Sequence, residues 1–172
     1  MAERRDPMVA VAQAIVSVQG AAIDHAGTRA TVGRIEAIPG GTNVIASTVH
    51  AWLDARAETD DETHLLVADI ERRALQAAAD NGCSATLTEE SWAGAVHFHP
   101  GLRERFALAL GQIPQLSSGA GHDAGVLAAY VPSAMLFVRN QTGISHAPEE
   151  FADVDDCVAG IDALEQLLRD LL

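Results

Sequence analysis

The stretch PGGTNVIASTVHAWLDAR, residues 39–56, combines a Gly-rich turn with a segment of alternating character. One set of alternate positions is apolar, and it includes Val49, Leu53 and Ala55. The positions between them, such as Asp54 and Arg56, are mainly polar. A period of two is typical of a half-buried strand, so the sequence predicts a strand over residues 44–56.

The segments around this strand predict a small layered domain. A helix is expected over residues 3–23, with Asp6 as its cap and Pro7 at its first position. A strand over 29–38, a helix over 64–82 and a strand over 85–92 complete the order α-β-β-α-β. This order is a split βαβ pattern without its first strand, which leaves one edge of the sheet open.

The second half predicts the last part of an α/β layer fold. A short helix over 102–113 is followed by a Gly-rich turn that opens another helix within 117–130. Residues 133–140 predict a buried strand, and 155–172 an amphipathic terminal helix. We therefore expect an incomplete domain over residues 1–92 and a second domain segment over 93–172.

Composition narrows the class of protein. The 172 residues are 48% hydrophobic, which is enough for a folded core. The net charge is −13 with no lysine, so nucleic acid is not an expected partner. No apolar run is as long as a membrane span, and the two cysteines lack metal-type spacing, so we expect a cytoplasmic protein that binds no membrane.

Three groups of residues carry candidate chemistry. His146 stands in the loop TGISHAPEE, directly after the predicted strand, where it could be a metal ligand or an ordinary loop residue. Gly119 and His122 stand in SSGAGHDA, which could hold an anion or simply form a tight turn. Asn43 and Arg56 could bind a carboxylate and a carbonyl group, or Arg56 could form a surface ion pair. The other histidines lack paired spacing and are expected to be structural.

The order of three segments resembles one known family. PGGTNVIASTVHAWLDAR, then SSGAGHDAGVLAAYVPSAMLFVRNQTGISHAPEE, then a terminal amphipathic helix, are similar to the C-terminal part of the hydantoinase/carbamoylase amidases. These metal-dependent amidohydrolases act on N-carbamoyl amino acids, β-ureido acids or allantoate, and MLFVRNQTGISH is most similar to the allantoate branch. The resemblance implies an α+β lid, or dimerisation, domain without its first strand and the last segment of an aminopeptidase-like α/β catalytic domain.

The resemblance also implies a metal site that this chain holds in part. Two divalent ions, zinc or manganese with nickel or cobalt as further candidates, would activate a water that attacks the carbonyl carbon. His146 would be the one ligand from this part of the chain, and the general base and remaining ligands would lie upstream. Asn43 and Arg56 would hold the substrate, Gly119 would contact its backbone, and His122 would lie in the same active-site loop.

Two details qualify this expectation. The family commonly has Pro-Gly after NVI, whereas this chain has Ala46 and Ser47, which alters the turn that carries Asn43. Asn43 and Arg56 are thirteen positions apart, about 40 Å along an extended strand. We therefore expect either that the chain folds back between them or that they serve different active sites across a homodimer formed through the lid sheet.

We expect this chain to be a C-terminal fragment that is inactive alone. Two alternatives to this interpretation remain open. The chain could be a non-catalytic α/β dimerisation module that has lost the metal site. It could also be one half of a split hydrolase whose other half is encoded separately. An open sheet edge and half a catalytic core would, if the chain is a fragment, make the product prone to aggregate or obligately dimeric.

Overall fold

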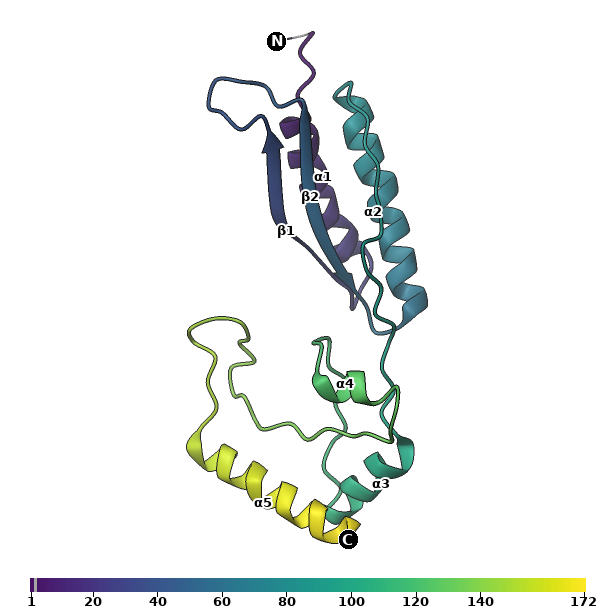
Figure 1. Ribbon diagram of the computed structural model, residues 1–172, viewed down its shortest axis with the longest axis vertical. Helices are drawn as coiled ribbons and strands as arrows, with labels where there is room; N and C mark the ends of the chain where they lie inside the picture. The colour runs from purple at the N-terminus through teal and green to yellow at the C-terminus, as the bar shows by residue number, and fades with distance from the viewer. Residues whose placement is uncertain (2) are drawn as a thin grey trace. The chain divides into compact units, whose positions relative to one another are not determined.

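A computed structural model describes residues 1 and 3–172 (Figure 1). The chain divides into two compact units, Met1–Ala95 and Val96–Leu172. The division falls three residues after the boundary expected from the sequence. The assignment of these units to a lid and a catalytic segment stays a prediction.

Two helices and a two-stranded sheet form the first unit. Their bounds are α1, Pro7–Asp24; β1, Arg29–Ile38; β2, Thr48–Arg56; and α2, Asp60–Asp80. The strands are antiparallel, with Arg29 opposite Arg56 at one end and Ile38 opposite Thr48 at the other. The register shifts between Val32 and Arg34, where β1 contains an irregularity of the bulge type.

The core of the first unit lies between the two helices and the sheet (Figure 1). It contains four buried side chains, Val18 and Ala21 from α1 and Leu66 and Ile70 from α2. The half-buried side chains that pack against it from the sheet are Ala30, Val32, Leu53 and Ala55. Leu53 and Ala55 are two of the apolar alternate positions of β2, so the period of two in the sequence correctly predicted which face the helices cover.

Both helices begin with side-chain caps. Asp6 caps α1 as predicted, because its Oδ1 accepts the backbone N–H of Met8 at 3.0 Å, and Pro7 takes the first position. Thr59 and Glu62 form a capping box at the start of α2. The predicted starts at residues 3 and 64 were therefore wrong. Each helix begins where a cap satisfies its first amides.

The connection between the strands is longer than predicted. Ser47 donates both its N–H and its hydroxyl to the carbonyl oxygen of Ile38, at 2.8 and 2.9 Å, and Ala46 is buried. Residues 44–47 therefore close a loop, and β2 begins at Thr48 instead of residue 44. The Ala46-Ser47 pair, which departs from the family pattern, closes this loop.

Residues 85–92 were predicted as a strand and do not form one. Side-chain contacts hold this segment instead: Trp52 Nε1 donates to Glu90 Oε1 at 3.3 Å, and the His64 ring stacks on Trp92 with centroids 4.3 Å apart. A strand requires a hydrogen-bonded neighbour, and the described sheet contains only β1 and β2. The sequence has the composition of a strand here, but no partner strand is present within the described residues.

Three helices and long irregular segments form the second unit. Their bounds are α3, Pro100–Ala109; α4, Asp123–Leu127; and α5, Val154–Leu171. The strand predicted over 133–140 is absent for the same reason, since no described segment pairs with it. Leu167 is the only buried hydrophobic side chain among the described residues of this unit.

α1 has some properties of a membrane-spanning helix. By length and composition alone, Pro7–Asp24 would be long and apolar enough to cross a membrane, which was not expected from the sequence. Its buried residues, Ala10, Val18 and Ala21, include two of the core side chains of the first unit. Core helices of soluble proteins meet the same criterion, so this finding alone assigns no membrane.

Candidate functional site

The loop that carries His146 is shaped by one asparagine side chain. Asn140 Oδ1 accepts the backbone N–H groups of Thr142 and Gly143, at 3.2 and 3.0 Å, and the Thr142 hydroxyl at 3.0 Å. Its Nδ2 donates to the carbonyl oxygen of Ile144 at 2.7 Å. Gly143 has a positive φ of 67°, which glycine adopts without strain. The turn before His146 is therefore fixed by local hydrogen bonds.

His146 itself has a backbone conformation that is uncommon for a residue with a side chain. Its φ is 58°, in the left-handed region, and its N–H donates to Glu150 Oε2 at 2.9 Å. Strained backbone of this kind clusters at functional sites, which agrees with a functional role for this exposed imidazole. Glu150 therefore stabilises this loop through its carboxylate. Neither Glu149 nor Glu150 lies in the first turn of a helix, because α5 begins at Val154.

The beginning of this loop segment is attached to the start of α5. Arg139 Nε donates to Asp156 Oδ2 at 2.9 Å, and this pair raises the pKa of Arg139 above its ordinary value. Gln141 Nε2 donates to Asp153, which occupies the N-cap position of α5 without a side-chain capping hydrogen bond. The terminal helix therefore positions the beginning of the loop. His146 itself lies in a segment without regular secondary structure.

SSGAGHDA forms the second candidate group. His122 occupies the N-cap position of α4, and its Nε2 lies 2.9 Å from the Ser118 hydroxyl. The His122 ring also meets the edge of Phe137, with centroids 6.0 Å apart. Gly119 lies in the exposed, irregular stretch before α4. α4 has only five residues, so the anion-binding helix start expected from the sequence is short.

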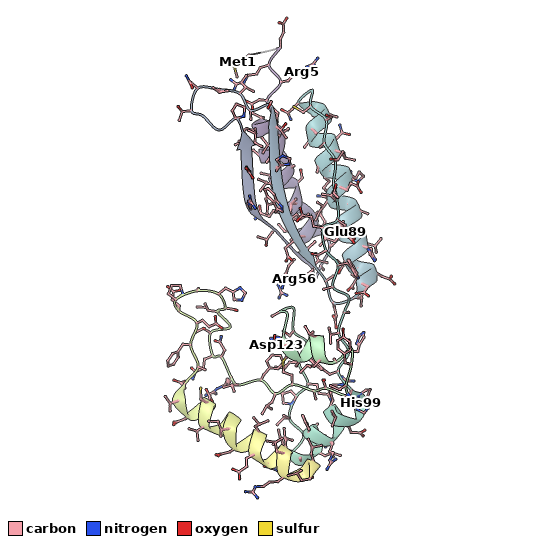
Figure 2. The ribbon with its side chains drawn as sticks, viewed as in Figure 1. Met1, Arg5, Arg56, Glu89, His99 and Asp123 are labelled. Atoms are coloured by element: carbon pink, nitrogen blue, oxygen red, sulfur yellow. The ribbon has the colours of Figure 1, made fainter. Side chains whose placement is uncertain are left out.

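Asn43 and Arg56 lie at opposite ends of β2. Asn43 is exposed in the loop between the strands. Arg56, labelled in Figure 2, is the last residue of β2. The nine residues of β2 alone span about 26 Å at about 3.3 Å per residue. Arg56 donates from Nε to Asp54 Oδ2 at 2.7 Å and from Nη2 to Oδ1 at 3.3 Å. One small substrate cannot bridge that length.

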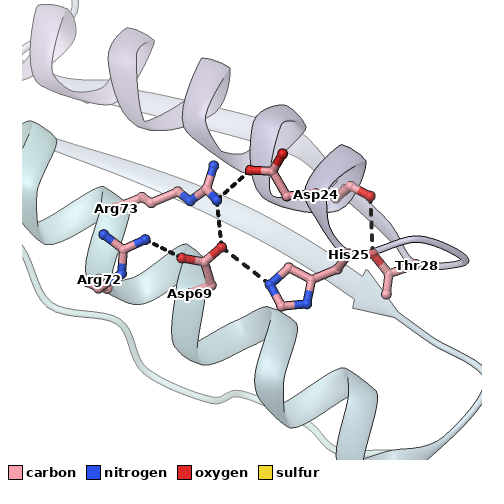
Figure 3. A network of polar contacts seen from close by, with 7 residues as sticks. Asp24, His25, Thr28, Asp69, Arg72 and Arg73 are labelled. Carbon is pink, nitrogen blue, oxygen red and sulfur yellow. Dashed lines mark hydrogen bonds and ion pairs between the residues drawn. The ribbon is translucent and has the colours of Figure 1, made fainter.

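A polar network at the end of α1 has a structural role (Figure 3). Arg73 Nη2 lies 2.8 Å from Asp69 Oδ2 and 2.7 Å from Asp24 Oδ2, and His25 Nε2 is 3.3 Å from Asp69. The hydrogen bond from Arg73, together with the pairing of Arg72, lowers the pKa of Asp69 to about 2. These contacts join the C-terminal end of α1 to α2.

The described residues do not complete a metal site. Among residues 1 and 3–172, no three His, Cys, Asp or Glu side chains converge as a group that could hold an ion. A metal centre needs three or four protein ligands, and His146 offers one. The donor set of the described residues therefore does not fit a dinuclear centre by itself.

Two contributing residues, Ser118 and Asn140, were not identified from the sequence. Each supports a candidate residue or its loop, as Glu150 also does. Asn140 had a recognisable signal, since asparagine two residues before a Thr-Gly pair is typical of a turn that the side chain closes. His99 proved structural, as expected, because its Nδ1 caps α3 by accepting the N–H of Leu102 at 3.2 Å.

The profile of peptidase family M20/M25/M40 matches residues 7–170. A Pseudomonas N-carbamoyl-L-amino-acid amidohydrolase is 33% identical over 170 residues, and a rice protein described as a probable allantoate deiminase is 32% identical over 186. The matches cover 95% and 89% of this chain but only 41% and 38% of those proteins. The chain thus spans about two fifths of the relatives' length.

Solved structures share the fold. A hydantoinase/carbamoylase family amidase from Burkholderia vietnamiensis superposes with a TM-score of 0.89 at 30% identity, over 99% of this chain and 43% of that one. A dinuclear metal binding peptidase of the M20 family from Bacillus subtilis gives a TM-score of 0.66 at 17% identity, over 94% and 45% of the two chains. The predicted family resemblance and the α/β fold class are both confirmed.

Proposed function

The chain belongs to peptidase family M20/M25/M40, and from this membership we propose that it is the C-terminal portion of an amidohydrolase that cleaves a linear C–N bond. The observation that carries the proposal is the match to N-carbamoyl-L-amino-acid amidohydrolase, which covers 95% of this chain and 41% of the relative. On this proposal the chain lacks activity alone. The remaining catalytic residues come from another segment or another chain.

The substrate we propose is an acid with a ureido or carbamoyl group. Three N-carbamoyl-L-amino-acid amidohydrolases are 30–34% identical to this chain, and the rice probable allantoate deiminase is 32% identical. These identities are too close to separate the two substrates, so both belong to the proposal. An anionic substrate is compatible with the arginine at the end of β2, because a guanidinium pairs with a carboxylate through two hydrogen bonds.

His146 is proposed as one ligand of a divalent metal centre whose other ligands lie outside this chain. The similar Bacillus subtilis peptidase is a dinuclear metal binding protein, and zinc or manganese would suit an imidazole ligand in such a centre. Three features support the role of His146: its exposure, its left-handed backbone and the local hydrogen bonds that hold its loop. Bound metal would supply an activated water, while His146 would hold its ion in place.

The substrate residues are proposed to act across a homodimer. Asn43 and Arg56 are separated by the length of β2, about 26 Å, so they would contact different active sites. His122 and Gly119 would line the same site as His146. The assembly would form through the first unit, where one strand edge and apolar positions of α1, such as Val16 at 69% exposure, are accessible. A cytoplasmic location, with no nucleic acid or membrane partner, is part of the proposal.

A chimera tests this proposal. The part of the Pseudomonas relative that precedes its match is fused to residues 7–172 of this chain and assayed with N-carbamoyl-L-amino acids and with allantoate. We expect divalent-metal-dependent hydrolysis by the chimera and none by this chain alone. The matched control is His97→Ala, which removes another exposed loop histidine, while His146→Ala should abolish turnover and reduce bound metal.

Three outcomes of this experiment would reject the proposal. Robust turnover by the isolated chain would show that it holds a complete site. A folded, metal-loaded chimera that hydrolyses neither substrate, or a His146→Ala variant with unchanged metal content, would show that these residues have a different role.

A second candidate function is a non-catalytic dimerisation module. The observation in its favour is that no three metal-binding side chains converge within residues 1 and 3–172. This alternative predicts that the chimera stays inactive while the chain still forms a stable dimer. A split hydrolase, in contrast, predicts activity when a separately encoded upstream half is added.

A further inference from the structure

The hydroxyl of Ser118 stands between a backbone amide and an imidazole. Ala120 donates its N–H to Ser118 Oγ at 3.2 Å, and the same oxygen lies 2.9 Å from His122 Nε2. A serine hydroxyl has one proton to donate and two lone pairs that accept. The amide of Ala120 uses one lone pair, and the proton is available for the ring nitrogen.

The direction of these hydrogen bonds determines the tautomer of His122. If Ser118 donates to Nε2, that nitrogen is an acceptor, and the neutral ring must carry its proton on Nδ1. The Ala120 N–H, the Ser118 O–H and Nε2 then form a chain in which each hydrogen bond polarises the next. If His122 Nε2–H donated to Ser118 instead, Ser118 Oγ would accept both hydrogen bonds, from Ala120 and from His122. The cooperative chain would then be lost.

A second contact restrains the same ring. Phe137 meets the His122 ring at 73°, an edge-to-face arrangement, with centroids 6.0 Å apart. The N-cap position fixes the His122 backbone, since its carbonyl oxygen accepts the N–H of Gly125 at 2.8 Å. The backbone, the ring and Nε2 of His122 are thus each held by a contact. No hydrogen bond to Nδ1 of His122 is found among the residues that the structure describes.

We propose that Ser118 is a positioning residue that holds His122 in its Nδ1–H tautomer and so presents Nδ1–H as a hydrogen-bond donor to an oxygen of the substrate. The inference rests on the proposed function, because a substrate oxygen is what the donor would meet. The ligand class is a carboxylate or a polarised carbonyl group, which accepts such a hydrogen bond. Ser118 itself forms no bond to the substrate and acts only through His122.

The experiment measures the tautomer directly in the full 172-residue chain. Side-chain ¹⁵N spectra of histidine-labelled protein, at a pH where the ring is neutral, distinguish a protonated nitrogen from a bare one, and His122→Gln identifies the His122 signals. We expect Nδ1–H as the major form. Ser118→Ala should make it the minor form, and Ser118→Thr, which keeps a hydroxyl, should restore it.

Ser117→Ala is the matched control, since it removes the neighbouring hydroxyl of the same loop and should leave the tautomer unchanged. Nε2–H as the major form in the parent chain would overturn the inference. A Ser118→Ala variant with the parent's spectrum would also overturn it, because it would show that Ser118 does not determine the tautomer of His122. These spectra require no turnover, so an inactive chimera with the expected tautomer would contradict the proposed function and the substrate contact of His122, while the positioning of the ring by Ser118 would stand.

Discussion

His146 shows how single residues determine the conformation of a loop that has no regular secondary structure. Its left-handed backbone is compatible with its neighbours because Glu150 accepts its N–H and Asn140 closes the turn before it. A residue in this region of φ costs conformational energy that the surrounding contacts must offset. The position of the imidazole is therefore specified by the side chains of the loop itself.

Asp69 predicts a measurable acid sensitivity of the first unit. Its pKa is lowered from the ordinary 3.8 to about 2, chiefly by the hydrogen bond from Arg73. A carboxyl with a lowered pKa in the folded state stabilises that state above its ordinary pKa, and this contribution is lost as pH falls from about 4 through about 2. Asp69→Asn should lack this loss and be less stable than the parent at pH 7.

Urea unfolding of the first unit, followed between pH 2 and pH 7, measures this effect. The control is Glu71→Gln, an exposed carboxyl on the same helix, which should keep the parent's acid profile. An Asp69→Asn variant with the parent's stability at every pH would show that the ion pairs in Figure 3 contribute nothing to folding.

At the scale of elements, adjacent leucines of α2 give a matched test of the core. Leu66 is fully buried against α1 and the sheet, whereas Leu65 is 62% exposed. Leu66→Ala should destabilise the first unit by about 2–5 kcal/mol, because it removes buried methyl groups and leaves a cavity. Leu65→Ala should change stability by less than about 0.5 kcal/mol. Equal effects in denaturant titrations would contradict this packing.

β2 predicts an alternating pattern of hydrogen exchange. β1 pairs with one edge of β2, and the described sheet has no strand at the other edge. Every second amide of Thr48–Arg56 should therefore be protected, and the amides between them, like those of residues 85–92, should exchange rapidly. Uniform protection along β2 would show that another strand occupies the open edge in solution.

These elements also show how far the sequence carries a prediction. The bounds of β1 and the inner face of β2 followed from local periodicity, and Asp6 and Pro7 marked the start of a helix. Residues 85–92 and 133–140 have the composition of strands, but pairing depends on a distant neighbour that local sequence does not describe. Ser118 was not identified because its importance comes from the distance to His122.

The sequence predicted which residues belong to the candidate site. It did not predict how their side chains are arranged. The order of SSGAGHDA and TGISHAPEE carried the family resemblance, which the comparisons confirmed. The separation of Asn43 from Arg56 followed from strand geometry. The contacts of Asn140 and Glu150 depend on turn conformations with positive φ, which single residues do not specify.

At the scale of the whole molecule, the two units differ in how much apolar surface they bury. The first unit has a core cluster, but the second buries only Leu167 among its described hydrophobic residues. On α5, the large apolar side chains that remain about half exposed or more are Val154, Val158, Ile161, Leu164 and Leu168. Surfaces of this kind favour association or binding to another chain.

We therefore expect the purified chain to be dimeric or aggregated, with no cooperative melting of the second unit. Light scattering after size exclusion, together with calorimetry, measures both properties. A monomer with one sharp transition that includes both units would contradict this expectation, because it would show that the second unit is stable with its apolar side chains exposed.

We propose that this chain contributes one ligand, His146, to a metal centre whose other ligands lie outside it. The most direct measurement is a calorimetric titration of the isolated chain with Zn²⁺ and with Mn²⁺, beside its His146→Ala variant. We predict no tight site for either ion and at most weak, His146-dependent binding, because no three metal-binding side chains converge within residues 1 and 3–172. Tight binding of two ions per chain would contradict this claim.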